Sequence, residues 1–198
     1  MFGIEETLLA LFQQFGYAVL FIIVFAESGL FIGFFLPGDS LLFTAGLLAS
    51  QGHLDLAIVL FGTALAAILG DQVGYWSGKK FGPRFFSKPN DFFRDPKHVR
   101  EAEEFYQKYG KISIVLARFM PAVRTFAPIV AGIGKMDYTE FVVYNIAGGI
   151  LWTVVFVGLG YTLGSTIPDA ENLLLPIVGG IMVLSLVPIL WKMGKKKK

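Results

Sequence analysis

The sequence has no cysteine and only two histidines, which limits the metal chemistry open to it. Without cysteine there is neither a disulfide nor a thiolate metal ligand. His53 and His98 lie far apart, without the spacing of a ligand pair. We therefore predict no metal site and no cofactor.

Charged residues are also scarce, at 16% of 198 residues, whereas 55% are hydrophobic. The mean hydropathy of +0.63 lies outside the range of soluble domains. The sequence predicts an integral membrane protein with one membrane domain over residues 1–198, and no nucleic-acid partner. The N-terminal stretch MFGIEETLLALF carries acids where a signal peptide carries basic residues, so we expect the first apolar segment to remain in the mature protein.

The basic residues predict the topology because they gather in residues 79–111 and in the tail 192–198. By the positive-inside rule both stretches, and hence the C-terminus, are cytoplasmic, and 79–111 is a cytoplasmic connector. Three segments, 54–78, 141–164 and 173–191, are apolar and long enough to cross a hydrocarbon core of about 30 Å. The last of them is predicted to be a C-terminal transmembrane helix.

Two further apolar segments, 17–50 and 112–134, must each begin and end on one side of the membrane under this topology. Each is predicted to be a re-entrant hairpin, since prolines and a glycine interrupt it near its middle. The predicted breaks are Pro37, Gly38, Pro121 and Pro128. Non-helical backbone at membrane depth persists only where it is buried in protein or lines a wet cavity, so the sequence predicts a polar cavity.

An internal repeat accompanies these hairpins at an offset of 86 residues. The matching positions are Ala45-Gly46 with Ala131-Gly132, Gly62 with Gly148, and Gly74, Tyr75 and Gly78 with Gly160, Tyr161 and Gly164. Coincidence is the alternative in a chain with 23 glycines, but the order of elements repeats too. One hairpin opens outside and the other inside, which predicts inverted repeats. The fold class is thus an all-α integral membrane protein with two re-entrant helical hairpins in an inverted repeat and about three transmembrane helices.

Four charged residues lie inside the predicted hairpins: Glu27, Asp39, Arg118 and Arg124. Unpaired, each would cost about 2.5–3.5 kcal/mol, so we expect pairing or hydration. Two arginine–carboxylate pairs could simply hold the hairpins together, but charges at membrane depth are more often functional. Because the arginine fork suits phosphate, we predict that Arg118 and Arg124 bind an anionic headgroup. Glu27 and Asp39 are predicted to exchange protons as the arginines bind or release it.

Weaker candidates lie around these four residues. Asp71 lines the cavity or hydrogen-bonds to the hairpin backbone, with equal weight. Asn145 is predicted to bond between helices and Trp152 to pack as an aromatic side chain, with cavity lining as the alternative for both. Ser40 and Thr125 are further candidates to line the cavity. The four-residue spacing of Gly70, Gly74, Gly78 and Gly82 predicts a helix-packing stripe.

The motifs FAESGLFIGFFLPGDSLLFTAG, GDQVGYWSGKKFG, ARFMPAVRTFAPIVAG and YNIAGGILW resemble those of the DedA family, also described by VTT or SNARE-associated domains. The resemblance covers about residues 15–165. It implies facing hairpins, location in the bacterial cytoplasmic membrane, and proton-dependent return of undecaprenyl phosphate to the cytoplasmic leaflet. Eukaryotic relatives scramble phospholipids. The family's functional acids correspond to Glu27 and Asp39, and its arginines to Arg118 and Arg124.

Several functions are compatible with these charges. A flippase for an anionic lipid phosphate is favoured, because inward movement of a negative headgroup is opposed by about 2.3 kcal/mol per charge per 100 mV and accompanying protons would offset that cost. A passive phospholipid scramblase and a small-ion or proton exchanger are the alternatives. We predict no enzyme, since the hairpins contain no histidine and no metal ligand set. Homo-oligomerisation stays open.

Overall fold

The computed structural model describes residues 2–30, 38–85, 100, 104 and 106–166, with side chains described outside 2–14, 82–85 and 121–122. Within those ranges the chain is helical and contains no strand, which confirms the all-α prediction. The predictions for Pro37, the helix 173–191, the tail 192–198 and most of the connector 79–111 lie outside the described residues.

Two helices, α3 (Leu56–Phe85) and α8 (Tyr138–Thr166), are long and apolar enough to cross a membrane. Their apolar stretches of 26 and 29 residues each exceed a core of about 30 Å at about 1.5 Å per residue. An aspartate caps each start: the Ile58 amide donates to Asp55 at 2.9 Å and the Glu140 amide to Asp137 at 3.1 Å. Both helices correspond to predicted spans.

The N-terminal part of the chain differs from the prediction. Helix α1 (Phe2–Gly29) is one continuous helix of 28 residues, and it begins well before residue 17, where the predicted hairpin starts. The difference has a simple cause, since this region has no proline, and Gly3 and Gly16 weaken a helix without ending it. Helix α2 (Gly38–Ser50) follows, with Asp39 in its first turn.

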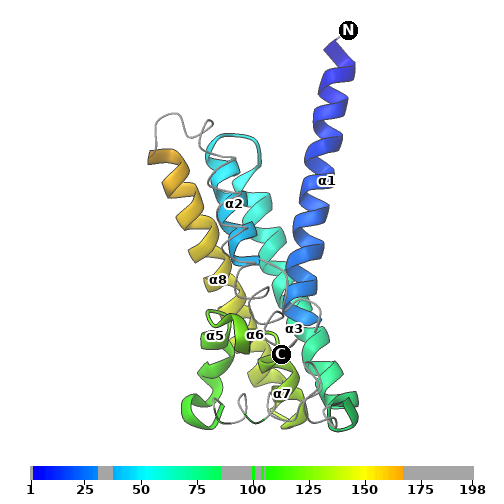
Figure 1. Cartoon of the computed structure of the whole chain (residues 1–198), viewed down its shortest axis with the longest axis vertical. Helices are drawn as coiled ribbons and strands as arrows, with labels where there is room; N and C mark the ends of the chain where they lie inside the picture. The colour runs from blue at the N-terminus through cyan, green and yellow to red at the C-terminus, as the bar shows by residue number, and fades with distance from the viewer. Residues whose placement is uncertain (1, 31–37, 86–99, 101–103, 105, 167–198) are drawn as a thin grey trace, which may run out of the picture. The chain divides into compact units, whose positions relative to one another are not determined.

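The segment that carries the arginines is broken into short pieces (Figure 1). A 3-10 turn (η2, Gly110–Ile112) precedes α5 (Ser113–Ala117), α6 (Pro121–Arg124) and α7 (Ala127–Ile133). Met120 is extended, as expected before a proline, and Pro121 opens α6. Pro128 lies in the first turn of α7, where its missing N–H costs nothing.

The chain divides into two compact units, which share α1, α3 and α8. The first unit contains α1 up to Ile22, α2, the start of α3 and the end of α8. In it, α2 and α8 touch backbone to backbone: a Cβ on Gly46 would lie 2.1 Å from the Val157 carbonyl oxygen, and one on Gly160 would lie 1.9 Å from that of Phe43. Only glycine allows this approach.

The second unit contains the end of α1, the rest of α3, the helices α5 to α7 and the start of α8. Its helices α7 and α3 are in equally close contact, since a Cβ on Gly132 would lie 2.1 Å from the Tyr75 oxygen and one on Gly78 would lie 2.0 Å from the Ile129 oxygen. A Cβ on Gly29 of α1 would lie 2.3 Å from the Gly70 oxygen. The predicted packing role of the α3 glycines is confirmed at Gly70 and Gly78.

The two units repeat one packing arrangement. In each, a short helix packs on a long helix of the other repeat: α2 on α8, and α7 on α3. Gly160 lies against Phe43, and the residues equivalent to these two in the other repeat, Gly74 and Ile129, are also in contact. A Cβ on Gly74 would lie 3.6 Å from Ile129 Cγ1. These equivalent contacts support the internal repeat. Its inverted orientation in the membrane stays a prediction.

Gly78→Ala is expected to destabilise the protein by about 1–3 kcal/mol, because the added methyl group would overlap the Ile129 carbonyl oxygen. Thermal unfolding in detergent measures the effect. Gly158→Ala in α8 is the matched control, since a Cβ there meets nothing within 4 Å and alanine favours a helix. An unfolding temperature of Gly78→Ala equal to that of Gly158→Ala would contradict the packing.

Candidate functional site

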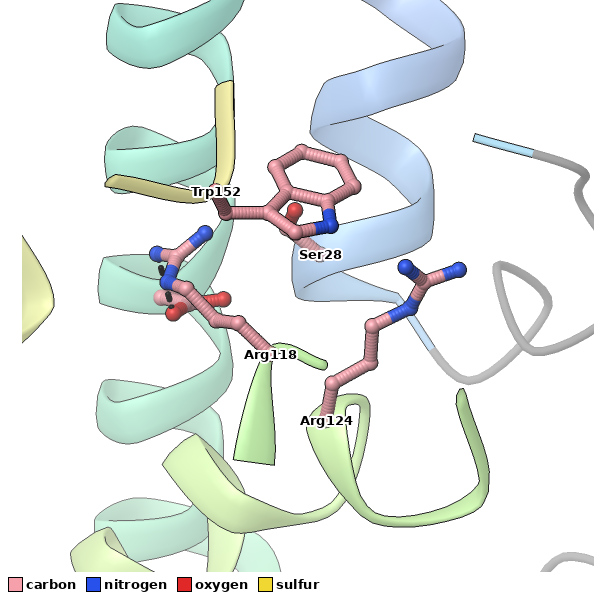
Figure 2. A pocket seen from close by; sticks show the side chains of 5 residues that line it. Ser28, Arg118, Arg124 and Trp152 are labelled. Atoms are coloured by element: carbon pink, nitrogen blue, oxygen red, sulfur yellow. Dashed lines mark hydrogen bonds and ion pairs between the residues drawn. The ribbon is translucent and has the colours of Figure 1, made fainter. Parts of the chain in front are cut away.

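A small cavity in the second unit is surrounded by charged side chains (Figure 2). It is lined by Ser28 of α1, Asp71 of α3, Arg118 after α5, Arg124 at the end of α6, and Trp152 of α8. Its empty volume, open mouth included, is about 200 Å³. Pockets for drug-sized ligands measure about 300–1,000 Å³, so the cavity has to widen before it takes a large headgroup.

Arg118 is buried, and its guanidinium joins two long helices. Its Nη2 donates to Asp71 Oδ2 of α3 and to Asn145 Oδ1 of α8, both at 2.5 Å. Gly148 and Gly149 of α8 leave space for the side chain: a Cβ on Gly148 would lie 3.1 Å from Arg118 Cδ. Arg118 Nε has no hydrogen-bond partner among the described residues. One donor of the fork therefore stays available.

Asn145 holds this arrangement from the side of α8. It is fully buried, and its Nδ2 donates to the Ile68 carbonyl oxygen on α3 at 3.1 Å. The amide group is thus oriented with its oxygen toward Arg118. Asn145 bonds between helices, as predicted, and its partner Arg118 lines the cavity.

Arg124 forms the second buried ion pair. Its Nη2 donates to Glu27 Oε1 on α1, and Glu27 is only 1% exposed. The Arg124 guanidinium carbon also lies 5.4 Å from the centre of the Trp152 ring, a cation–π contact. Glu27 Oε2 has no hydrogen-bond partner among the described residues. This second oxygen can accept a proton or a water molecule without breaking an existing bond.

The charges of the site balance, because two arginines face two carboxylates. Each pair is buried, so removal of one partner would leave an uncompensated charge in a medium that solvates it poorly. No group of three or more His, Cys, Asp or Glu that could hold a metal ion occurs in the described part of the chain. The arginines of the site can bind an anion, and its carboxylates can bind protons.

The structure brings together some of the predicted site residues and separates others. Arg118 and Arg124 both line the cavity, although one follows α5 and the other ends α6, and Glu27 pairs with Arg124. Asp71 lines the cavity and accepts a hydrogen bond from the Arg118 side chain, so of its two predicted roles the structure supports cavity lining. Asp39 and Ser40 lie in α2 of the first unit.

Three other residues deserve separate mention. Thr125 is buried, and it is not one of the described residues that line the cavity. Its Oγ1 has no hydrogen-bond partner in the described part of the chain. Trp152, for which packing was favoured over cavity lining, is one of the residues that line the cavity (Figure 2). Ser28 was not singled out by the sequence, and its position next to Glu27 is the signal that could have found it.

Comparison with known proteins identifies the family. The model of the VTT domain matches residues 36–162, more than half of the chain. The chain belongs to the DedA family. Protein DedA of Escherichia coli K12 is 44% identical over 190 residues, covering 93% of this chain and 86% of that protein. No solved structure matches.

Other relatives of this DedA-family chain are also named as membrane proteins. An uncharacterized membrane protein of Mycobacterium leprae is 43% identical over 169 residues, covering 85% of this chain and 75% of the relative. The inner membrane protein YqjA of Escherichia coli K12 is 34% identical over 190 residues, covering 91% and 85%. The predicted family and the membrane character are therefore confirmed.

Proposed function

We propose that this DedA-family protein is a transporter, driven by the proton-motive force, that returns undecaprenyl phosphate or a similar anionic lipid phosphate to the cytoplasmic leaflet. One observation carries the proposal: two arginines from separate parts of the broken segment line one cavity, and each donates to a buried carboxylate. Arginine can bind a phosphate group, as it binds a carboxylate, through two parallel hydrogen bonds. The headgroup would therefore replace Asp71 and Glu27 as the partner of the arginines.

Protons would make inward transport feasible. A phosphomonoester carries about −1.5 to −2 charges at neutral pH. Moving one charge against 100 mV costs about 2.3 kcal/mol, so inward movement of the bare headgroup is opposed by several kcal/mol. We propose that Glu27 takes up a proton when Arg124 turns to the phosphate. Asp39, in the first turn of α2, is proposed as a second proton-coupling residue.

The proposed location is the bacterial cytoplasmic membrane, with the basic C-terminus in the cytoplasm. Trp76 and Tyr138 are half-exposed, and Lys79 lies 5.1 Å from the Trp76 ring. Aromatic and basic residues in this combination are typical of a membrane interface, and the positive-inside rule assigns it to the cytoplasmic side. The breaks before Pro121 and at Thr125–Phe126 support a second re-entrant hairpin, because they let the chain turn within a short distance.

Relocation of undecaprenyl phosphate between the leaflets of proteoliposomes tests the proposal. We expect the wild type to move the lipid faster when a proton gradient is imposed, and Glu27→Gln to respond less to the gradient because it cannot exchange a proton. Arg118 and Arg124 stay in place in this variant, so residual movement is expected. A Glu27→Gln protein with the full wild-type response would contradict the role of Glu27.

The same assay separates the alternatives. Movement of ordinary phospholipids without a gradient, and none of undecaprenyl phosphate, would indicate a passive scramblase. Ion flux without lipid movement would indicate an exchanger. Chemical conversion of the lipid would reveal an enzyme, which we propose this protein is not.

A further inference from the structure

Asp71 is a buried carboxylate that the proposed function does not yet use in coupling. It is 4% exposed, it lines the cavity, and its Oδ2 accepts from Arg118 Nη2 at 2.5 Å. It lies within the long apolar helix α3, where a charged residue is costly. Helix packing alone does not require a charge there, because the glycines of α3 already provide close contacts.

The Asp71–Arg118 pair has the same construction as the Glu27–Arg124 pair. In both, a carboxylate on a long helix accepts from the Nη2 atom of an arginine on a short, broken segment. The charged groups around Asp71 are Arg118 from the α5 end, Arg124 from α6 and Glu27 from α1, while Asn145 of α8 is neutral. The cavity thus has two exchangeable pairs.

We propose that Asp71 is a proton-carrying residue, so that one phosphomonoester headgroup enters with two protons, one on Glu27 and one on Asp71. The inference rests on the proposed function and deepens it. The second proton is assigned to Asp71 and not to Asp39. Asp71 lines this cavity, whereas Asp39 is not one of the described residues that line it. The reason is charge balance: two arginines that turn to one dianionic phosphate leave two buried carboxylates without a partner.

The exchange balances in atoms and charge. The hydrogen bond from Arg118 Nη2 to Asp71 Oδ2 breaks, and Nη2 donates instead to a phosphate oxygen. The freed carboxylate of Asp71 binds one proton delivered by water from the side of higher proton concentration. Glu27 and Arg124 undergo the same exchange. Release of the phosphate on the other side restores both ion pairs and frees both protons.

This stoichiometry has an electrical consequence. A dianionic headgroup with two protons moves no net charge, so wild-type transport is expected to depend on the pH difference and not on the membrane potential. Asp71→Asn resembles the protonated residue in shape and charge but carries no transported proton. Each cycle of that variant would move one net negative charge inward, and an inside-negative potential would oppose it.

The test is inward movement of undecaprenyl phosphate in proteoliposomes with the potential clamped by a potassium gradient and valinomycin, at a pH where the phosphate is dianionic. For the wild type we expect equal rates at zero and at −100 mV. Asp71→Asn is expected to slow by up to about 50-fold at −100 mV, the factor for one charge across that potential. A purely structural role of Asp71 would change the rate without creating this sensitivity.

Two variants serve as controls. Asn145→Ala removes a neutral partner of the same Arg118 and no titratable group, so its transport should be slower but equally insensitive to the potential. Asp39→Asn tests the competing assignment: if this variant, and not Asp71→Asn, becomes sensitive to the potential, the inference is wrong.

The wild-type measurement keeps the inference testable even if Asp71→Asn does not fold. Wild-type movement that slows at −100 mV would rule out two protons per headgroup while leaving lipid transport intact. An Asp71→Asn variant that is folded and insensitive to the potential would also overturn the inference alone. A wild type that moves no lipid phosphate at all would overturn both the inference and the proposed function.

Discussion

Arg118→Ala is expected to abolish transport and to lower the free energy of unfolding by about 3–5 kcal/mol, because it leaves Asp71 as a buried charge without its partner. The Arg118 side chain is only 5% exposed, so water cannot readily take its place beside Asp71. Asn145 would lose a partner as well, which adds an unsatisfied amide oxygen. Lipid relocation and thermal unfolding of the purified protein measure the two effects separately.

A double variant separates stability from transport. Arg118→Met with Asp71→Asn removes both charges and keeps a similar volume, and we expect most of the lost stability to return while transport stays absent. Wild-type transport by the double variant would show that neither residue contacts the headgroup. Wild-type stability of Arg118→Ala would show that the pair is not buried as the structure has it.

Arg124→Lys is expected to reduce transport by about 10- to 100-fold, although the charge is kept. Lysine has no planar fork, so it loses at least one charge-assisted hydrogen bond to phosphate, worth about 1.5–3 kcal/mol. It also stacks less well on the Trp152 ring, which lies 5.4 Å from the arginine. Relocation rates measured at saturating lipid test the prediction.

Lys111→Gln is the control for a substitution of a basic residue elsewhere on the same segment. The hydrogen bond with Glu140 raises the pKa of Lys111, so this exposed lysine is charged at neutral pH. Exposed ion pairs contribute little to stability, and Lys111 lies outside the cavity lining described above, so its removal should leave transport unchanged. Equal transport by Arg124→Lys and wild type would contradict bidentate phosphate binding.

The broken segment could be predicted from its composition. Prolines force local breaks wherever they occur, so Pro121 and Pro128 indicate short helices without any knowledge of their neighbours. Proline gives no guidance in α1, which contains none: this continuous helix of 28 residues begins well before residue 17, the predicted start of the first hairpin. Boundaries that no proline or capping residue marks depend on packing, which the sequence pattern does not reveal.

The pairing of the charges could not be predicted. Arg118 meets Asp71, which lies 47 positions away, and Arg124 meets Glu27, which lies 97 positions away. From the sequence, Asp39 was the more plausible partner, because it lies in a predicted hairpin, whereas Asp71 was expected to line the cavity or to bond to the hairpin backbone. The choice depends on how far each helix is rotated about its axis, and close glycine contacts such as Gly78 on Ile129 set that rotation in the second unit.

The sequence by itself determined the membrane character, the family, the two long apolar helices and the break that separates the two arginines, since each follows from composition, local sterics or motif. Only the tertiary structure decided which carboxylate holds which arginine, that Asn145 orients Arg118, and that the Trp152 ring walls the cavity. These contacts join residues from α1, α3, α5, α6 and α8, and their geometry depends on helix packing over distances of a few ångströms.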